Sequence, residues 1–130
     1  MIRGTTETFK FKLPCSCNEI KSVKIVFWQE GNNGPSKDRP LPIVKVLSQC
    51  TTTESPQELA VILGQEETLR FSDKRKGKVQ MRAYSESGAC FACKPTLFNV
   101  YPIIDETILG ETILPTPDDG DMIILDGEHI

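Results

Sequence analysis

Four cysteines stand in two close pairs whose thiols have the residue type and spacing of metal ligands. Cys15 and Cys17 lie in LPCSCNE, and Cys90 and Cys93 lie in GACFACK. A structural zinc site needs four ligands in tetrahedral positions, and its usual signature is two C-x2-C knuckles. Only the second pair has that spacing, so the four are candidate zinc ligands rather than favoured ones. Packing as small apolar side chains is the preferred interpretation, as it is for Cys50.

Other reactive groups do not form a catalytic pattern. A redox interpretation of Cys90 and Cys93 requires a helix N-terminus after a strand, which this sequence does not predict. Cysteine or serine nucleophiles need a histidine base, and the single histidine is His129, next to the last residue. The sequence contains no G-x-G-x-x-G, P-loop or H-E-x-x-H motif. We therefore expect no catalytic residues and no enzyme.

Charge is unevenly distributed between a body and a tail. Residues 105–130 contain eight acidic residues and no lysine or arginine, while residues 1–104 contain all 15 basic residues against 10 acidic ones. Such asymmetry predicts a basic body and an acidic arm that attract each other, within one chain or between chains. The alternative is an arm that only keeps the protein soluble.

A cluster of basic residues marks one predicted turn of the body. It consists of Lys74, Arg75, Lys76 and Lys78. A solvated hairpin tip, a binding site for the acidic arm and a nucleic-acid contact are the three interpretations. Tyr84 is the only ring nearby, so we do not expect nucleic acid as a partner.

The arm carries an apolar segment of its own in DMIILDG. We predict that Ile123, Ile124 and Leu125 anchor the arm, either as a strand added to a neighbour's sheet edge or folded back on the same chain. Deletion of residues 116–130 should then lower the assembly state.

Alternating apolar and polar residues predict strands along the body. Phe9, Phe11 and Leu13 are expected on one face, and Trp28 is expected to pack in the core rather than stack on sugar. GQEETLRFS predicts a short helical turn. Further inward residues are predicted in the remaining strands and in that turn: Val23, Ile25, Phe27, Leu69, Phe71, Val79, Met81, Ala83, Phe98 and Val100. Six or seven short strands separated by turns predict an immunoglobulin-like antiparallel β-sandwich, with a small barrel as the alternative.

The length of 130 residues predicts one sandwich domain over residues 1–104 followed by the acidic arm over residues 105–130. No window approaches the roughly 18 apolar residues of a membrane span, and no secretory signal is expected. An odd number of cysteines, five, argues for thiols in a reducing cytoplasm.

Several segments together resemble a family of small uncharacterised phage and prophage proteins of Gram-positive bacteria, commonly encoded near tail genes. The segments are MIRGTT, LPCSCNEIKSVKIVFWQ, LGQEETLRFS and GKVQMRAYSESGACFACKPTLFNVYPII. The N-terminal domains of phage baseplate upper proteins are a more distant likeness. The cysteine pairs and the longer tail depart from the family's pattern. The resemblance implies a virion structural protein of the tail or baseplate region, made in the host cytoplasm and then built into the virion.

The prediction is thus a non-enzymatic structural or assembly protein whose partners are copies of itself or other phage proteins. No cofactor is expected apart from the zinc alternative, and no membrane. Two other functions stay open: a zinc-stabilised binding module, and a domain that contacts carbohydrate or receptors on a host surface.

Overall fold

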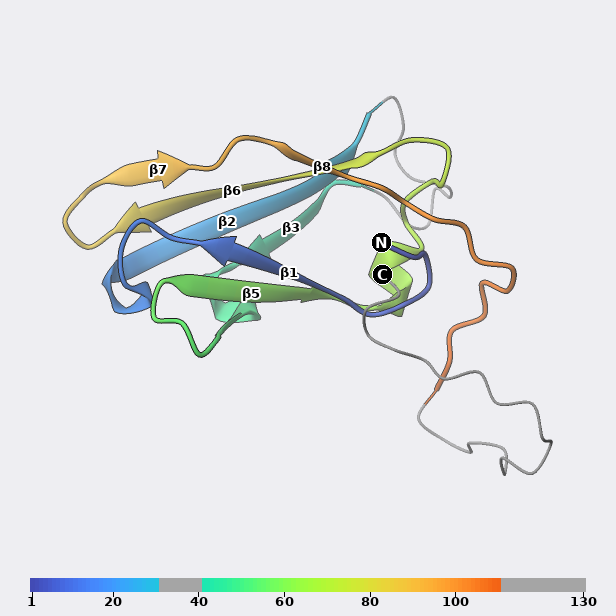
Figure 1. The fold of residues 1–130 in the computed structure, drawn as a ribbon, viewed down its shortest axis with the longest axis horizontal. Coiled ribbons are helices and arrows are strands. Elements are labelled where there is room, and N and C mark those ends of the chain that lie inside the picture. Colours follow the sequence, from blue (N-terminus) through green and yellow to red (C-terminus); the bar gives the residue numbers. More distant parts are fainter. Residues whose placement is uncertain (31–40, 111–130) are drawn as a thin grey trace.

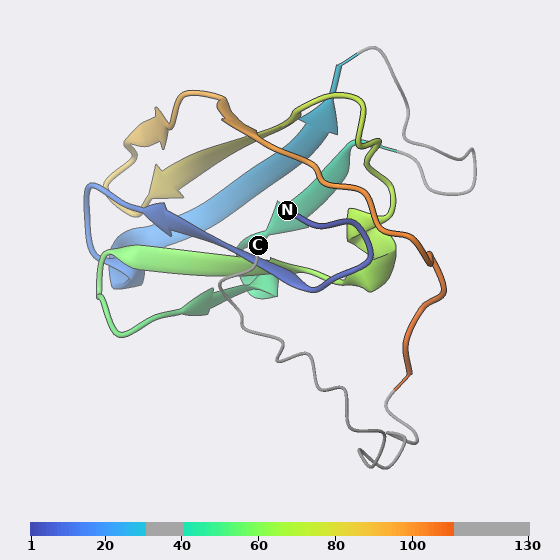
Figure 2. The same cartoon turned by 45° about the vertical axis from the view of Figure 1, so that its right-hand side comes forward.

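Two antiparallel sheets pack face to face in the computed structural model, which describes residues 1–30 and 41–110. One sheet has the order β1-β5-β4, and the other has the order β3-β2-β6-β7 with β8 also pairing with β6. In Figure 1 the strands β1 and β5 lie in front of β2 and β3, and the turned view of Figure 2 separates the two layers. The predicted all-β sandwich is therefore confirmed, whereas its immunoglobulin-like detail stays a prediction.

The elements follow the predicted segments closely. The strands of the first sheet are β1 (Glu7–Lys12), β4 (Cys50–Thr52) and β5 (Glu58–Leu63); those of the second are β2 (Ile20–Gln29), β3 (Ile43–Val46), β6 (Gly77–Ser85), β7 (Cys90–Ala92) and β8 (Thr96–Phe98). The helix α1 spans Gln65–Thr68, and two 3-10 turns cover Cys17–Glu19 and Leu47–Gln49. The described part of the chain has eight strands rather than six or seven, because two short segments, β4 and β7, form separate strands.

Strand alternation sends one set of side chains between the sheets. Ile25 and Phe27 of β2 are fully buried, and Met81 of β6 is nearly so. Phe9 packs edge-on against both Phe27 and Phe98, with ring centroids 5.0 and 5.2 Å apart. Phe9, Phe11 and Phe98 are partly buried against this core, and Trp28 is exposed; every other predicted inward residue is buried.

One end of the sandwich is closed by α1 and by polar contacts from the first residues. Arg3 is buried and donates from Nε to the Phe71 carbonyl at 2.6 Å and from an Nη to the Leu69 carbonyl at 3.2 Å. Its guanidinium also pairs with both carboxylate oxygens of Glu106. A buried guanidinium is stable only with such partners, so Arg3 ties residues 69–71 and 106 to the N-terminal segment.

The first part of the predicted arm is fastened to the body. Besides the Arg3–Glu106 pair, the side-chain amide of Gln65 makes two hydrogen bonds of 2.9 and 2.8 Å with the backbone of Leu109. The predicted boundary between residues 104 and 105 therefore falls inside a segment that contacts the sandwich. Residues 111–130, with the predicted anchors Ile123, Ile124 and Leu125, lie outside the described residues.

Candidate functional site

The outward surface of the five-stranded sheet is the candidate site, and it is called the outer face below. Its side chains alternate with the buried ones on β2 and β6, so Trp28 points out where Phe27 points in. The exposed apolar members come from four strands, β2, β3, β6 and β8: Trp28, Val44, Val46, Tyr84 and Leu97. Each is between 39% and 54% exposed. A concentration of exposed apolar residues on one sheet face is typical of an interaction surface.

A groove of about 430 Å³ runs through the outer face beside Trp28. Val26 and Trp28 of β2 form part of its lining, together with Lys78 and Gln80 of β6. Pro42 and Pro95 contribute rings from the segments before β3 and before β8. Because the lining combines an indole, two proline rings and the side chains of Val26 and Val79, the groove offers an apolar surface with a cation at its margin.

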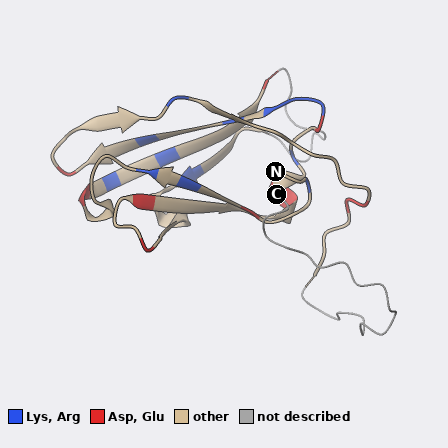
Figure 3. Ribbon diagram, in the orientation of Figure 1, with Lys and Arg blue, Asp and Glu red and all other residues tan. Residues whose placement is uncertain are grey.

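Basic side chains lie in this groove and further along the same face. Lys78 lies with Nζ 5.4 Å from the centroid of the Trp28 ring and 3.5 Å from a carboxylate oxygen of Glu30. Lys24 and Arg82 are paired in register on neighbouring strands, and both are exposed on the same face. Figure 3 shows the corresponding blue bands on β2 and β6. The outer face is thus apolar and positively charged at once.

A second hollow of about 290 Å³ lies further along the same strands. Its lining includes Lys24 and Arg82, and also Ser22, Tyr84 and Cys90. The two hollows share no lining residue, but both open on the outer face, and Val26 and Lys24 connect them along β2. The outer face therefore has two recesses along a single strand.

Sequence reasoning was wrong about Trp28. We expected its indole in the core because the strand is apolar, yet the ring is 39% exposed and lines the groove. The signal was present, since Phe27 and Trp28 are adjacent and a strand cannot send both to one face. The outer face was missed because Val44, Val46 and Leu97 come from separate strands that only the fold brings together.

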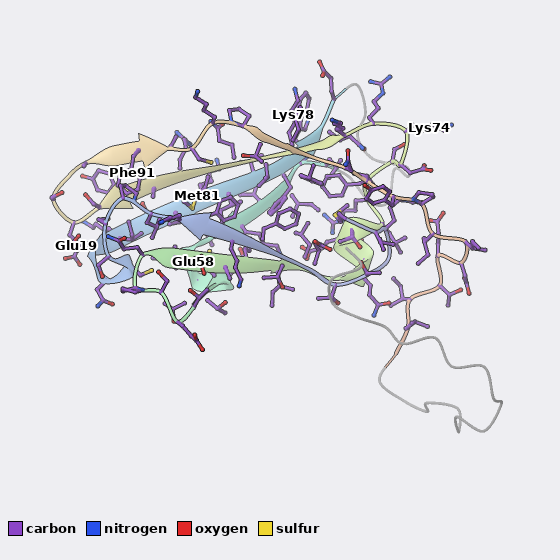
Figure 4. The ribbon with its side chains drawn as sticks, viewed as in Figure 1. Glu19, Glu58, Lys74, Lys78, Met81 and Phe91 are labelled. Atoms are coloured by element: carbon purple, nitrogen blue, oxygen red, sulfur yellow. The ribbon has the colours of Figure 1, made fainter. Side chains whose placement is uncertain are left out.

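The predicted basic cluster is divided between two places. Lys74, Arg75 and Lys76 line a hollow of about 350 Å³ with residues 99–102, whereas Lys78 belongs to the groove on the outer face. Figure 4 shows Lys74 on the turn that precedes β6 and Lys78 on the strand itself. The buried side chain of Gln29 holds the turn, because its Nε2 donates to the carbonyls of Ser72 and Arg75 at 2.6 and 2.9 Å.

The paired cysteines of GACFACK face opposite sides of their strand. Cys90 is exposed on the outer face, whereas the sulfur of Cys93 accepts a hydrogen bond from the Met81 amide at 3.2 Å and packs against the core. Residues i and i+3 of an extended segment point in opposite directions, so this C-x2-C spacing does not form a knuckle. A knuckle needs a turn between its two cysteines, whereas the segment that begins at Cys90 is the strand β7.

Cys15 and Cys17 lie together near Glu19. This is the same end of the body as the turn between β6 and β7, because the Glu86 amide of that turn donates to the Glu19 carbonyl at 2.8 Å. The Cys17 thiol donates to the Glu58 carbonyl at 3.2 Å. Desolvation, with the Glu19 carboxylate and Cys17 adding to it, raises the pKa of the Cys15 thiol. A raised pKa disfavours the thiolate that metals and electrophiles require. Within residues 1–30 and 41–110, no three His, Cys, Asp or Glu side chains gather in a way that suits a metal ion.

The chain matches no known protein-family model, and no curated protein shows significant sequence similarity to it. In the part of the chain that the structure describes, no helix has the length and apolar character needed to cross a membrane.

Proposed function

We propose that this chain is a non-enzymatic structural or assembly protein that acts through contacts between subunits, with the outer face as a principal contact surface. The observation that carries the proposal is the exposure of Trp28, Val44 and Val46 on one face of a packed sandwich. Aromatic residues with aliphatic neighbours and basic residues at the margin are the composition expected of a protein interface.

The setting of the proposal comes from the resemblance to phage and prophage proteins encoded near tail genes. In that setting the chain is a virion component of the tail or baseplate region, produced in the host cytoplasm and incorporated during assembly. Its partners are further copies of itself and other virion proteins. The role is geometric: the sandwich supplies a rigid surface, and the acidic C-terminal residues supply charge opposite to that of the basic body.

Native mass spectrometry of the reduced full chain, recorded from low to high concentration, tests this proposal. It reads the number of subunits and any bound metal in the same spectrum. A discrete oligomer with no added mass is the expected result. A monomer at every concentration contradicts self-association, and a mass increase of one zinc ion per chain supports the zinc-stabilised module instead.

A second candidate is a domain that contacts carbohydrate or a receptor on a host surface. The exposed indole of Trp28 in its groove favours it, because aromatic rings stack on sugars and the ring is accessible. Titration of the monomer with soluble oligosaccharides, followed by Trp28 fluorescence, separates the two candidates. A saturable change with sugar supports the second, and a change only with protein concentration supports the first.

A further inference from the structure

We infer that the outer face binds the C-terminal segment of a second copy, with LPTPDDGD, residues 114–121, lying along β2 from Trp28 toward Lys24. This inference rests on the proposed self-association and identifies the surface and the ligand that produce it. The ligand is an acidic, proline-containing peptide in an extended or polyproline II conformation.

The apolar half of the groove suits proline. Grooves that recognise extended proline-containing peptides are lined with aromatic side chains, onto which proline rings pack at little cost in conformational entropy. Here Trp28, Val26, Pro42 and Pro95 line the groove. The C-terminal segment has Pro115 and Pro117 in Leu-Pro-Thr-Pro, two residues apart. These two rings therefore suit an apolar groove that Trp28 lines.

The charges also match in sign. Residues 111–130 contain six acidic residues and no lysine or arginine. The groove is bordered by Lys78, and Lys24 and Arg82 lie next to each other further along the sheet. Asp118, Asp119 and Asp121 follow directly after the prolines, so that a peptide whose prolines contact Trp28 presents carboxylates to these cations.

The spacing of the charges agrees with that of the chain. Lys24 lies four residues before Trp28 on β2, which is about 13 Å at the rise of a strand. Asp121 lies four residues after Pro117, which is about 12 Å in polyproline II. With Pro117 at the indole, Asp121 therefore reaches Lys24 and Arg82, and Ile123 and Ile124 come to the second hollow beside Tyr84.

The attachment of the preceding residues favours docking on another copy. Arg3 holds Glu106, and Gln65 of α1 holds Leu109. Figure 1 shows the chain around residues 105–109 beside α1. In the same view β1 and β5 lie in front of β2, so the outer face of the five-stranded sheet is directed to the back. The segment that leaves Leu109 thus starts away from its own outer face, and a neighbouring copy can present that face directly.

Complementary charge reversals test the inference in the full chain. One variant carries Lys24→Glu with Arg82→Glu, and a second carries Asp118→Lys, Asp119→Lys and Asp121→Lys. Either variant alone places like charges opposite each other, so we expect self-association weaker by about tenfold or more in sedimentation velocity. An equimolar mixture should restore association, because each variant then offers what the other lacks. Circular dichroism melts confirm that both variants fold.

Each alternative gives a different pattern. Wild-type association in both variants overturns the inference and leaves self-association standing through another surface. The inference is also overturned if both variants lose self-association and the equimolar mixture does not recover it. Docking of the C-terminal segment on its own chain would give that result, because mixing does not change contacts within one chain. A wild-type chain that is monomeric throughout removes the proposed self-association itself. The double variant Pro115→Ser with Pro117→Ser should weaken association while leaving every charge in place.

Discussion

The two sheets of this sandwich present very different surfaces to the solvent. The outward residues of the three-stranded sheet are mostly short or charged, with Thr8, Lys10 and Lys12 on β1 opposite Ile62, Ala60 and Glu58 on β5. Only Ile62 is a large exposed apolar residue on those strands. The outer face of the five-stranded sheet instead exposes Trp28, two valines, a tyrosine and a leucine around three basic side chains.

The difference shows what the sandwich alone requires. A sheet in a sandwich needs one apolar face for the core and a polar face for water, and the three-stranded sheet meets that requirement. The outer face of the second sheet exceeds it, because its apolar residues contribute nothing to the packing between sheets. A face that is apolar without structural need is the better candidate for binding.

The largest loss of stability should come from truncating one of two neighbouring residues on β2, Phe27, and the other neighbour, Trp28, should give a smaller loss. Phe27→Ala removes a fully buried ring that packs against Phe9, so we expect a loss of about 3–5 kcal/mol in the free energy of unfolding. Trp28→Ala removes a ring that is partly in solvent and should cost about 1–2 kcal/mol. Urea denaturation of dilute protein measures both. Equal losses would mean that Trp28 belongs to the core after all.

A pair of matched substitutions compares the two surfaces in binding. Trp28→Ala should weaken self-association by about tenfold or more, because a tryptophan at the centre of an interface carries a large share of the binding energy. Ile62→Ala, on the outward surface of the three-stranded sheet, should leave it unchanged. Sedimentation equilibrium gives both association constants. Equal weakening by the two variants would show that the three-stranded sheet also takes part.

The salt dependence of self-association distinguishes the two surfaces by their charges. Association through the outer face should weaken as salt rises from about 50 to 300 mM, because the charges involved are solvent-exposed and screened. Lys24→Glu with Arg82→Glu should reverse that dependence, because acidic side chains then face the acidic segment and salt screens their repulsion. Lys10→Glu with Lys12→Glu should preserve it. The measurement is sedimentation velocity over a salt series. If the Lys10/Lys12 variant changed the salt dependence and the Lys24/Arg82 variant did not, the contact would lie on β1 instead.

The smallest effect concerns Glu7, at the start of β1. Desolvation raises the pKa of its carboxyl, opposed by the N-terminal ammonium, and Oε2 is buried without a hydrogen-bond partner among the described residues. Because the pKa of Glu7 is raised in the folded state, the folded protein binds the Glu7 proton more tightly than the unfolded chain does. Protonated Glu7 therefore favours the folded state at low pH, and this contribution to stability is lost as pH rises through the raised pKa.

Glu7→Gln should therefore raise Tm by about 1–3 °C at neutral pH, since Glu7 is only partly buried and solvent screens the rest. The gain should disappear below the ordinary carboxyl pKa, where Glu7 is protonated in both states. Differential scanning calorimetry at pH 7 and pH 3.5 measures it. A gain of the same size at both pH values would point to packing rather than to ionisation.

The fold was largely predictable because alternation is a local signal. Phe9, Ile25, Phe27 and Met81 reveal their inward direction through neighbours one residue away. The site was not predictable in the same way, because the groove joins Trp28 to Pro42 and Pro95 from distant segments. The predicted basic cluster joined Lys78 to Lys74, Arg75 and Lys76 because they are close in sequence, whereas the structure divides them between two hollows.

Fluorescence of the single tryptophan shows whether the outer face becomes buried when copies of the chain associate. Trp28 is the only tryptophan in the chain, so its emission reports on the groove without any label. Iodide quenching should be efficient at low protein concentration and should fall as the chain associates, together with a blue shift of the emission maximum. An oligomer that forms while quenching and emission stay constant would contradict the account, because Trp28 would then remain in solvent and the contact would lie elsewhere.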